Sequence, residues 1–239
     1  MKTALLLIAL GERYRRFLWD VLLPSAKQFF VPHTPIVWCD TFKEMNFNAI
    51  GIHQDDLGFP AATFRRYHFF SEQAHILAEF DQVFYCDVDM RFVAPVSGED
   101  IFSDGITATL HPGFVAGYID ASGYLVSTAG TPERNPKSTA MIPIGTNNRY
   151  FCGGFNGGST QEFLKMTNKI RENIDIDTQN GVFARWHDEA HLNRYLYDNP
   201  PSRILTPSFC YPENYPGQWG WPPNQYPPLL VALDKGNKI

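Results

Sequence analysis

Two aspartates separated by one residue, Asp87 and Asp89, follow an apolar run that ends in Phe84-Tyr85-Cys86. Such a run is typical of a buried strand. Side chains two positions apart on an extended chain point to the same side, so both carboxylates can converge at the C-terminal end of the strand, where α/β sheets bind ligands. Paired carboxylates suit Mg²⁺ or Mn²⁺ and leave coordination positions for a diphosphate. The alternative is a turn of solvated acids.

A second acidic segment, Trp186–Tyr195, has the sequence Trp-His-Asp-Glu-Ala-His-Leu-Asn-Arg-Tyr. Taken alone, Glu189 is interpreted as a surface carboxylate in the first turn of a helix, where the helix dipole favours it. His187 and His191 stand four residues apart, as in zinc proteases, but those enzymes need a glutamate directly after the first histidine. Asp188 occupies that place, and no obvious third ligand follows. A zinc hydrolase is therefore the weaker interpretation.

Two further segments lie between these acidic ones. The first is His111-Pro112-Gly113-Phe114, and the second is the stretch 150–158, which contains Gly153-Gly154 and Gly157-Gly158. The glycines do not form the Gly-x-Gly-x-x-Gly pattern of a dinucleotide site, and alone they indicate two tight turns. His111 alone is interpreted either as a buried histidine at the end of a strand or as a ligand-binding group.

Taken together and in this order, the four segments resemble glycosyltransferase family 6, which holds the histo-blood-group A and B transferases and the α1,3-galactosyltransferases. The resemblance runs from about Thr3 to Lys235. It implies a GT-A fold, with a mixed, mainly parallel sheet, helices on both faces, and nucleotide-binding and acceptor-binding halves in a single domain of residues 1–239. The implied activity is retaining α1,3-transfer of N-acetylgalactosamine or galactose from a UDP-sugar to a galactose-terminated oligosaccharide, with or without fucose.

The resemblance also implies roles for individual residues. Asp87 and Asp89 would bind Mn²⁺, with Mg²⁺ as the alternative cofactor, and Glu189 would be the catalytic residue beneath the anomeric carbon of the donor. There it would act either as a covalent nucleophile or as an electrostatic stabiliser of the oxocarbenium-like transition state. The implied donor-binding residues are Leu10, Tyr14, Arg66, Asp87, Val88, Asp89, Cys152, Gly153, Gly154, Asp188 and Lys235. The implied acceptor-binding residues are His111, Thr131, Trp186 and Glu213.

The family's donor-sugar pocket corresponds to Cys152-Gly153-Gly154. Small residues there leave space for an N-acetyl group, whereas bulkier ones favour galactose. Because Gly154 has no side chain, UDP-N-acetylgalactosamine is the expected donor and UDP-galactose is the second choice. Cys152 differs from the leucine, methionine or histidine of familiar vertebrate members.

Composition excludes several other classes of protein. The chain has 239 residues and a net charge of −5 without a basic cluster, which argues against a nucleic-acid surface. Residues 4–10 are too short an apolar run for a signal peptide, and no run approaches the roughly 20 apolar residues of a membrane span. The four cysteines, Cys39, Cys86, Cys152 and Cys210, are widely spaced, and we expect free thiols. Vertebrate members of the family carry a membrane anchor and stem; this chain is expected to begin at the catalytic domain and to be soluble and cytoplasmic.

The pattern of apolar residues predicts the elements that must hold these segments. Strands are expected at residues 4–10, 36–39, 49–52, 82–87, 106–111 and 148–155, and helices at 12–30 with an interruption at Pro24, 63–77, 159–173 and 188–197. Strands that alternate with helices over the first 90 residues indicate a mainly parallel sheet covered on both faces. Residues 207–228 are rich in proline and aromatic residues and are expected to be irregular but packed.

A rival interpretation is a catalytically silent carbohydrate-binding protein on the same fold. A binding protein needs no acidic set of the kind formed by Asp87, Asp89, Asp188 and Glu189, so the sequence favours an enzyme. The sequence gives no indication of oligomeric state.

Overall fold

The computed structural model describes residues 1–43, 48–115, 118–119, 125–126, 129–144, 149–214 and 225–236. Within them, a seven-stranded sheet has the order β10-β6-β9-β4-β1-β2-β3. Six strands run in the same direction, and β9, which lies between β4 and β6, runs antiparallel to both. The strands are β1 (Thr3–Ala9), β2 (Thr34–Cys39), β3 (Ile50–His53), β4 (Gln82–Cys86), β6 (Ile106–Leu110), β9 (Phe151–Ser159) and β10 (Arg203–Leu205). The predicted mixed, mainly parallel sheet is confirmed.

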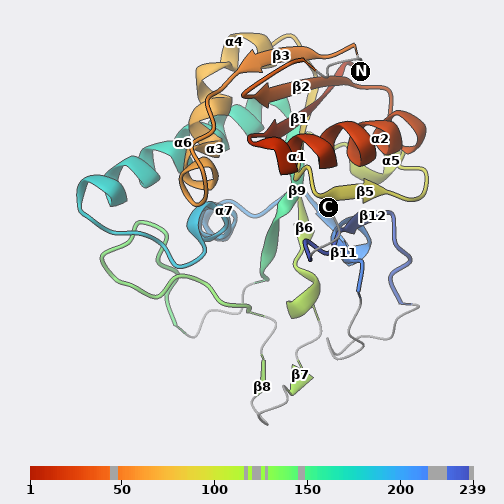
Figure 1. The fold of residues 1–239 in the computed structure, drawn as a ribbon. Coiled ribbons are helices and arrows are strands. Elements are labelled where there is room, and N and C mark those ends of the chain that lie inside the picture. The colour runs from red at the N-terminus through yellow and green to blue at the C-terminus, as the bar shows by residue number, and fades with distance from the viewer. Residues whose placement is uncertain are drawn as a thin grey trace.

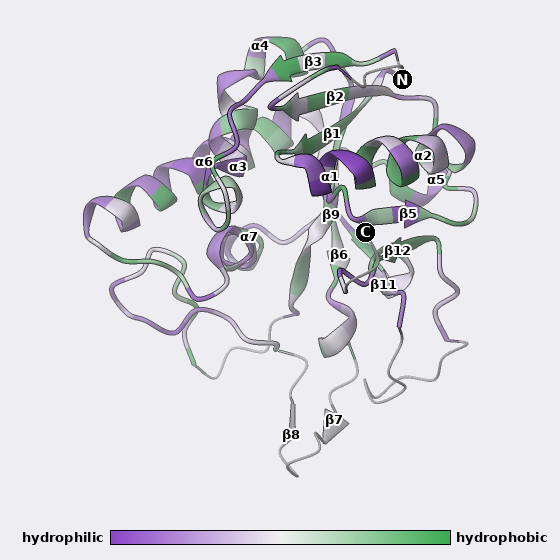
Figure 2. Ribbon diagram, in the orientation of Figure 1, coloured by the Kyte–Doolittle hydropathy of each residue, from purple (hydrophilic) through white to green (hydrophobic). Residues whose placement is uncertain are grey.

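Helices cover both faces of this sheet, as predicted, and bury a separate apolar core on each side (Figure 1). One face carries α1 (Glu12–Arg16), a π-helical stretch (Phe17–Leu22), α2 (Leu23–Phe29) and α5 (Gly98–Ile101). The other face carries α3 (Ala61–Glu72), α4 (Ala74–Leu77), α6 (Thr160–Gln179) and α7 (His187–Asp198). Figure 2 shows that α1 is hydrophilic and that hydrophilic residues predominate in the outer part of α6, whose buried side chains include Phe163, Met166 and Ile170.

Smaller elements complete the described part of the chain. A three-stranded sheet joins β5 (Met90–Phe92), β12 (Leu230–Ala232) and β11 (Tyr211–Pro212), and β7 (Tyr118–Ile119) pairs with β8 (Leu125–Val126). Two 3₁₀ turns cover Pro112–Phe114 and Pro207–Cys210. Of the stretch 207–228 that we expected to be irregular, residues 215–224 lie outside the described residues. No described helix combines the length and the apolar composition that crossing a membrane requires.

The glycines that we interpreted as two tight turns lie instead inside β9, the strand between β4 and β6. A side chain at Gly157 would place its Cβ 2.3 Å from the backbone oxygen of Val83, and one at Gly158 would place it 2.0 Å from that of Gly105. These backbones approach too closely for any other residue type, so the glycines serve strand packing rather than turns.

Other boundaries also differ from the sequence prediction. The first helix contains a π-helical stretch that ends two residues before Pro24, which has no N–H to donate to the preceding turn. The helix expected at 63–77 is broken at Gln73 into α3 and α4, and the helix expected to end at residue 173 continues to Gln179.

Candidate active site

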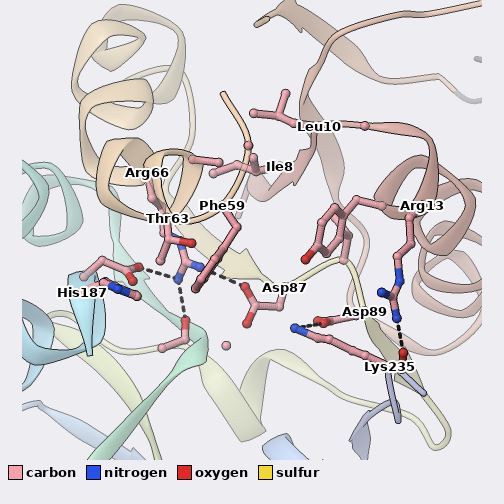
Figure 3. A pocket seen from close by; sticks show the side chains of 18 of the residues that line it. Ile8, Leu10, Arg13, Phe59, Thr63, Arg66, Asp87, Asp89, His187 and Lys235 are labelled. Atoms are coloured by element: carbon pink, nitrogen blue, oxygen red, sulfur yellow. Dashed lines mark hydrogen bonds and ion pairs between the residues drawn. The ribbon is translucent and has the colours of Figure 1, made fainter. Parts of the chain in front are cut away.

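A cleft of about 710 Å³ opens between α1, α3, α7 and the C-terminal segment (Figure 3). It lies where β1 and β4 end and β9 begins, so the segments after two parallel strands meet the start of an antiparallel one. Twelve of the sixteen residues predicted for the site line this cleft. They are Leu10, Tyr14, Arg66, Asp87, Val88, Asp89, Gly153, Gly154, Trp186, Asp188, Glu189 and Lys235.

Arg66, from α3, links the elements that surround the cleft. Its Nη1 donates to the carbonyl of Gly153 at 3.1 Å and lies 3.0 Å from Oδ2 of Asp188. Its Nη2 lies 3.1 Å from Oδ1 of Asp87, and the guanidinium stacks 4.2 Å from the centre of the Tyr85 ring. The side chain is 11% exposed, so one buried cation joins β4, β9 and α7.

The two aspartates after β4 have different partners. Asp87 accepts hydrogen bonds on Oδ1 from the Tyr85 hydroxyl at 2.5 Å and from Arg66, while its Oδ2 has no partner among the described residues. Asp89 is buried, and its Oδ2 lies 2.5 Å from Nζ of Lys235. Burial and the nearby charge of Asp87 raise the pKa of Asp89, and Lys235 opposes this rise.

Glu189, in the first turn of α7, accepts a hydrogen bond on Oε2 from the backbone N–H of Gly153 at 2.8 Å. Burial raises the pKa of Glu189 to about 7, against the opposing effects of the Gly153 N–H and the Tyr150 hydroxyl. Burial likewise raises the pKa of neighbouring Asp188 to about 6, although Arg66 opposes it. The two adjacent carboxyls therefore both have pKa values raised toward neutral pH.

The raised pKa of Glu189 predicts that Glu189→Gln stabilises the folded protein in a pH-dependent way. Below about pH 4.5 the carboxyl is protonated in both folded and unfolded states, so the substitution has little electrostatic effect. As the pH rises to about 7, the unfolded chain loses this proton first, and the parent loses stability. Above pH 7 the full cost is present, about 2 kcal/mol after allowance for solvent screening of this partly exposed group.

We therefore expect the melting temperature of Glu189→Gln to exceed that of the parent by about 5 °C at pH 8. The difference should shrink toward pH 4.5, and thermal unfolding across this pH range measures it. A variant that is less stable than the parent at pH 8 would contradict the proposed burial of the charge.

The C-terminal segment forms one wall of the cleft. Lys235 reaches Asp89, its carbonyl accepts a hydrogen bond from Arg13 of α1, and the N–H of Leu233 donates to the carbonyl of Asp89 at 2.9 Å. Glu213 contacts this wall but does not line the cleft. Its Oε2 accepts a hydrogen bond from the N–H of Asp234 at 2.9 Å, and its Oε1 lies 3.8 Å from Arg91.

Glu213 is therefore one of four predicted residues that do not line the cleft. His111 is mostly buried, its Nδ1 accepts the N–H of Gly113 at 3.1 Å, and burial lowers its pKa to about 4. Thr131 interacts with the Tyr150 hydroxyl, which in turn interacts with Glu189. Cys152 is buried in β9.

Sequence reasoning missed several residues of the cleft. The clearest is Phe59, which is 78% exposed and has its ring centre 5.5 Å from that of His187; the ring centre of Phe64 lies 4.7 Å from the same histidine. Figure 3 shows Phe59 directed into the cleft between Thr63 and Asp87. An apolar ring between Gly58 and Pro60 belongs to no periodic pattern, and this isolation is the signal that could have revealed it.

The sequence analysis also considered a histidine pair, His187 and His191, and four cysteines. His187 packs against Phe59 and Phe64, whereas His191 is buried 3.7 Å from Asp177, so the histidine pair does not converge on a shared point. In the part of the chain that the structure describes, no three histidine, cysteine or acidic side chains cluster as metal ligands. All four cysteines are free thiols, and Cys210 is the least buried.

The family model of glycosyltransferase family 6 matches residues 60–223. Histo-blood group ABO system transferase 1 of Rattus norvegicus is 36% identical over 169 residues, which is 71% of this chain and 44% of the relative. Globoside alpha-1,3-N-acetylgalactosaminyltransferase 1 of Homo sapiens is 31% identical over 147 residues, which is 61% of this chain and 39% of the relative.

A further relative, glycosyltransferase 6 domain-containing protein 1 of Mus musculus, is 27% identical over 221 residues, or 87% of this chain and 67% of the relative. The chain thus spans less than half the length of the ABO and globoside relatives. The family model covers well over half of the chain and includes the segments that supply Asp87, Gly153 and Glu189 to the cleft. The chain belongs to glycosyltransferase family 6.

Proposed function

We propose that this protein is a retaining α1,3-glycosyltransferase that transfers a hexose from a UDP-sugar to a glycan acceptor, and that residues 1–239 act as one catalytic domain. The observation that carries the proposal is that one cleft holds both the paired aspartates Asp87 and Asp89 and the separate carboxylate Glu189. Sugar transfer needs two such groups: one to hold the cation that neutralises a leaving diphosphate and one to face the cation that develops at the anomeric carbon.

Asp87 and Asp89 fit a divalent cation, for which we propose Mn²⁺, with Mg²⁺ as the alternative. Oδ2 of Asp87 has no partner among the described residues. Burial and, after it, repulsion from Asp87 raise the pKa of Asp89, and a dication between the two carboxylates would offset that repulsion. When bound, the ion would supply positive charge next to the leaving diphosphate. Arg66 and Lys235 flank the two aspartates and would add charge-assisted hydrogen bonds to the same group.

The part of the cleft beside the start of α1 suits the nucleoside of the donor. Tyr14 and Leu10 line the cleft beside the start of α1, and we propose that they contact the uracil. In this arrangement Val88 lies in the donor-binding segment between the two aspartates, and Asp188 hydrogen-bonds the donor sugar. Arg66 holds Asp188 in place through the 3.0 Å ion pair.

Glu189 would lie beneath the anomeric carbon, either as a nucleophile or as an electrostatic stabiliser. The Gly153 N–H fixes its carboxylate on the side of the cleft where β9 begins. Because both roles need the ionised carboxylate, the raised pKa of about 7 predicts that kcat/KM falls as the pH drops below neutral.

We propose UDP-N-acetylgalactosamine as the donor and a galactose-terminated oligosaccharide, with or without fucose, as the acceptor. The similar globoside enzyme is by its name an N-acetylgalactosaminyltransferase, which supports this choice of donor. Trp186, 44% exposed at the cleft, is the proposed acceptor contact. His111 and Thr131 would act from behind the cleft wall, and Glu213 would support the C-terminal segment.

The experiment that tests the proposed function measures UDP release from a panel of UDP-sugars, with and without a panel of galactosides. Acceptor-dependent release, together with an α1,3-linked product, is the expected result. Binding of galactosides without turnover of any UDP-sugar would favour a catalytically silent carbohydrate-binding protein instead.

Donor choice can be tested at the first two glycines of β9, Gly153 and Gly154. A Cβ at Gly154 would lie 3.0 Å from Oδ2 of Asp87, whereas one at Gly153 would make ordinary contacts with Arg66 and Glu189 at 3.5 and 3.6 Å. We expect Gly154→Ala to lower transfer from both donors because Asp87 must move. The loss should be larger for N-acetylgalactosamine, because the methyl group also crowds the space for the 2-acetamido substituent.

The measurement is the ratio of kcat/KM for UDP-N-acetylgalactosamine and UDP-galactose in the parent, Gly154→Ala and the neighbouring Gly153→Ala control. Gly153→Ala should leave the ratio near that of the parent, since its methyl group faces Arg66 and Glu189. Equal losses with both donors in Gly154→Ala would show that this position does not discriminate the acetamido group.

A further inference from the structure

On the edge that faces β4, the start of β9 extends beyond its partner strand, whereas on the other edge β6 still pairs Leu110 with Phe151. β4 pairs with β9 from Phe155 to Ser159, and the N–H of Asp87 then reaches the carbonyl of Gly154. Phe151 lies beyond this pairing, yet it is buried. Buried backbone N–H and C=O groups need hydrogen-bond partners, so another element must supply them here.

Helix α7 supplies these partners through two side chains. Oδ1 of Asn193 accepts the N–H of Phe151 at 2.8 Å, and its Nδ2 donates to the carbonyl of the same residue, also at 2.8 Å. One helical turn earlier, Oε2 of Glu189 accepts the N–H of Gly153 at 2.8 Å. The side chains of α7 thus hydrogen-bond to β9 as a neighbouring strand would.

The rise per residue of a helix and of a strand explains why the side chains of α7 can match the backbone groups of β9. Residues four apart on an α-helix rise about 6 Å along its axis. Residues two apart on a strand rise about 6.6 Å and direct their backbone groups to the same side. Asn193 with Phe151 and Glu189 with Gly153 therefore match in register, with α7 running antiparallel to the start of β9.

Asparagine suits this place because its carboxamide offers an acceptor and two donors at once. Nδ2 also donates to the carbonyl of Glu189 at 2.9 Å, which ties the same carboxamide to the turn that carries the catalytic carboxylate. Asn193 is 3% exposed, so water cannot replace these bonds. A carboxylate at this place would lack donors and face two carbonyl oxygens, and an apolar side chain would leave the Phe151 N–H and carbonyl unpaired.

We propose that Asn193 is a positioning residue for Glu189. Its carboxamide sets the register of α7 against β9, and this register holds the Glu189 carboxylate on the Gly153 N–H at the cleft. The inference rests on the proposed function, because Asn193 acts on sugar transfer only through Glu189.

The first test replaces Asn193 by leucine or aspartate, with Asn193→Ser as a milder variant in case the others do not fold. We expect kcat to fall about 10- to 100-fold in the folded protein, because a small displacement of a catalytic group is costly. The KM for the UDP-sugar should stay within about twofold of the parent, since the aspartates and the nucleoside contacts lie elsewhere.

Two control variants separate positioning from general stability. Asn199 stands on the C-terminal side of the same helix, and its Nδ2 also donates to the carbonyl four residues earlier, that of Tyr195, but it does not bond to β9. Buried Thr107 donates to the carbonyl of Ile101 at 2.8 Å away from the cleft. Asn199→Leu and Thr107→Val should lower the melting temperature at most, with kcat unchanged.

A double-mutant cycle tests whether Asn193 acts through Glu189. In the Glu189→Gln background, Asn193→Leu should cost less than about threefold further in kcat, because the catalytic carboxylate is already gone. Full additivity of the two effects would overturn the proposal, as would a folded Asn193→Leu variant with the parent's kcat.

Hydrogen exchange at the Gly153 amide provides a readout that does not depend on activity. Asn193→Leu should speed exchange of this amide at least about tenfold, and Asn199→Leu should not. Unchanged protection of Gly153 would overturn the proposal even if the protein proves to be an active transferase. If Gly153 protection is lost but the parent releases no UDP from any UDP-sugar, the proposed function fails while the structural role of Asn193 stands.

Discussion

Replacing Glu189 by alanine should lower kcat by about 10²–10⁴, because a preorganised carboxylate that faces a developing cation is worth several kcal/mol. The dissociation constant for UDP should change little, since the aspartates, Tyr14 and Leu10 lie on other walls of the cleft. Glu189→Gln should be similarly inactive, because the amide keeps the shape of the side chain and loses its charge.

The Gln variant also answers the objection that Glu189 is merely structural. It is expected to be at least as stable as the parent at pH 8, so a loss of turnover there cannot be assigned to unfolding. Glu172→Gln, on the exposed side of α6, is the matched control and should keep full activity. Measuring kcat, UDP affinity and melting temperature on these variants decides the matter, and a stable Glu189→Gln enzyme with near-normal kcat would remove Glu189 from catalysis.

Asp87→Asn and Asp89→Asn should each abolish Mn²⁺-supported transfer, because each removes a charge that faces the metal and the leaving diphosphate. The structure adds a difference between the two variants. Asp87→Asn takes one of two carboxylate partners from Arg66, which keeps Asp188, whereas Asp89→Asn leaves the ammonium of Lys235 without its acidic partner. Asp89→Asn should therefore also loosen the C-terminal wall of the cleft.

The measurements are transfer rates over a range of Mn²⁺ concentrations and the affinity for Mn²⁺ by calorimetry. Asp104→Asn, an exposed aspartate outside the cleft, is the control and should behave as the parent. Full activity of the parent in excess chelator would refute the metal dependence.

Much of the fold followed from patterns that act over short distances. The apolar runs of β1, β2 and β4 and the helical spacing of α3 and α7 were recognisable because burial imposes a period on the sequence. β9 was harder to predict: its glycines look like turn residues, and only the closeness of the Val83 and Gly105 backbones explains why they lie in a strand. That closeness is a property of the assembled sheet and leaves no local signal.

The candidate site likewise combines residues that the sequence revealed with contacts that only the folded structure creates. Asp87, Asp89 and Glu189 stood out because acidic residues after apolar runs are conspicuous and because the ordered motifs resemble a known family. The joint contact of Arg66 with Asp87, Asp188 and Gly153 could not be read from the sequence, since it depends on α3, β4, β9 and α7 meeting at one point. Phe59 was missed for the related reason that a loop residue carries no periodicity.

The C-terminal wall of the cleft has a consequence for the order in which the chain acquires its structure during synthesis. Arg13 contacts the carbonyl of Lys235 across 222 positions of sequence, and β12 pairs with β5, which follows directly after the aspartate pair. A ribosome emits the N-terminal strands and α3 first, so the sheet can start to form while the cleft still lacks a wall. The last contacts form only after residue 235 has left the exit tunnel, so until then the nascent cleft lacks the lysine that pairs with Asp89.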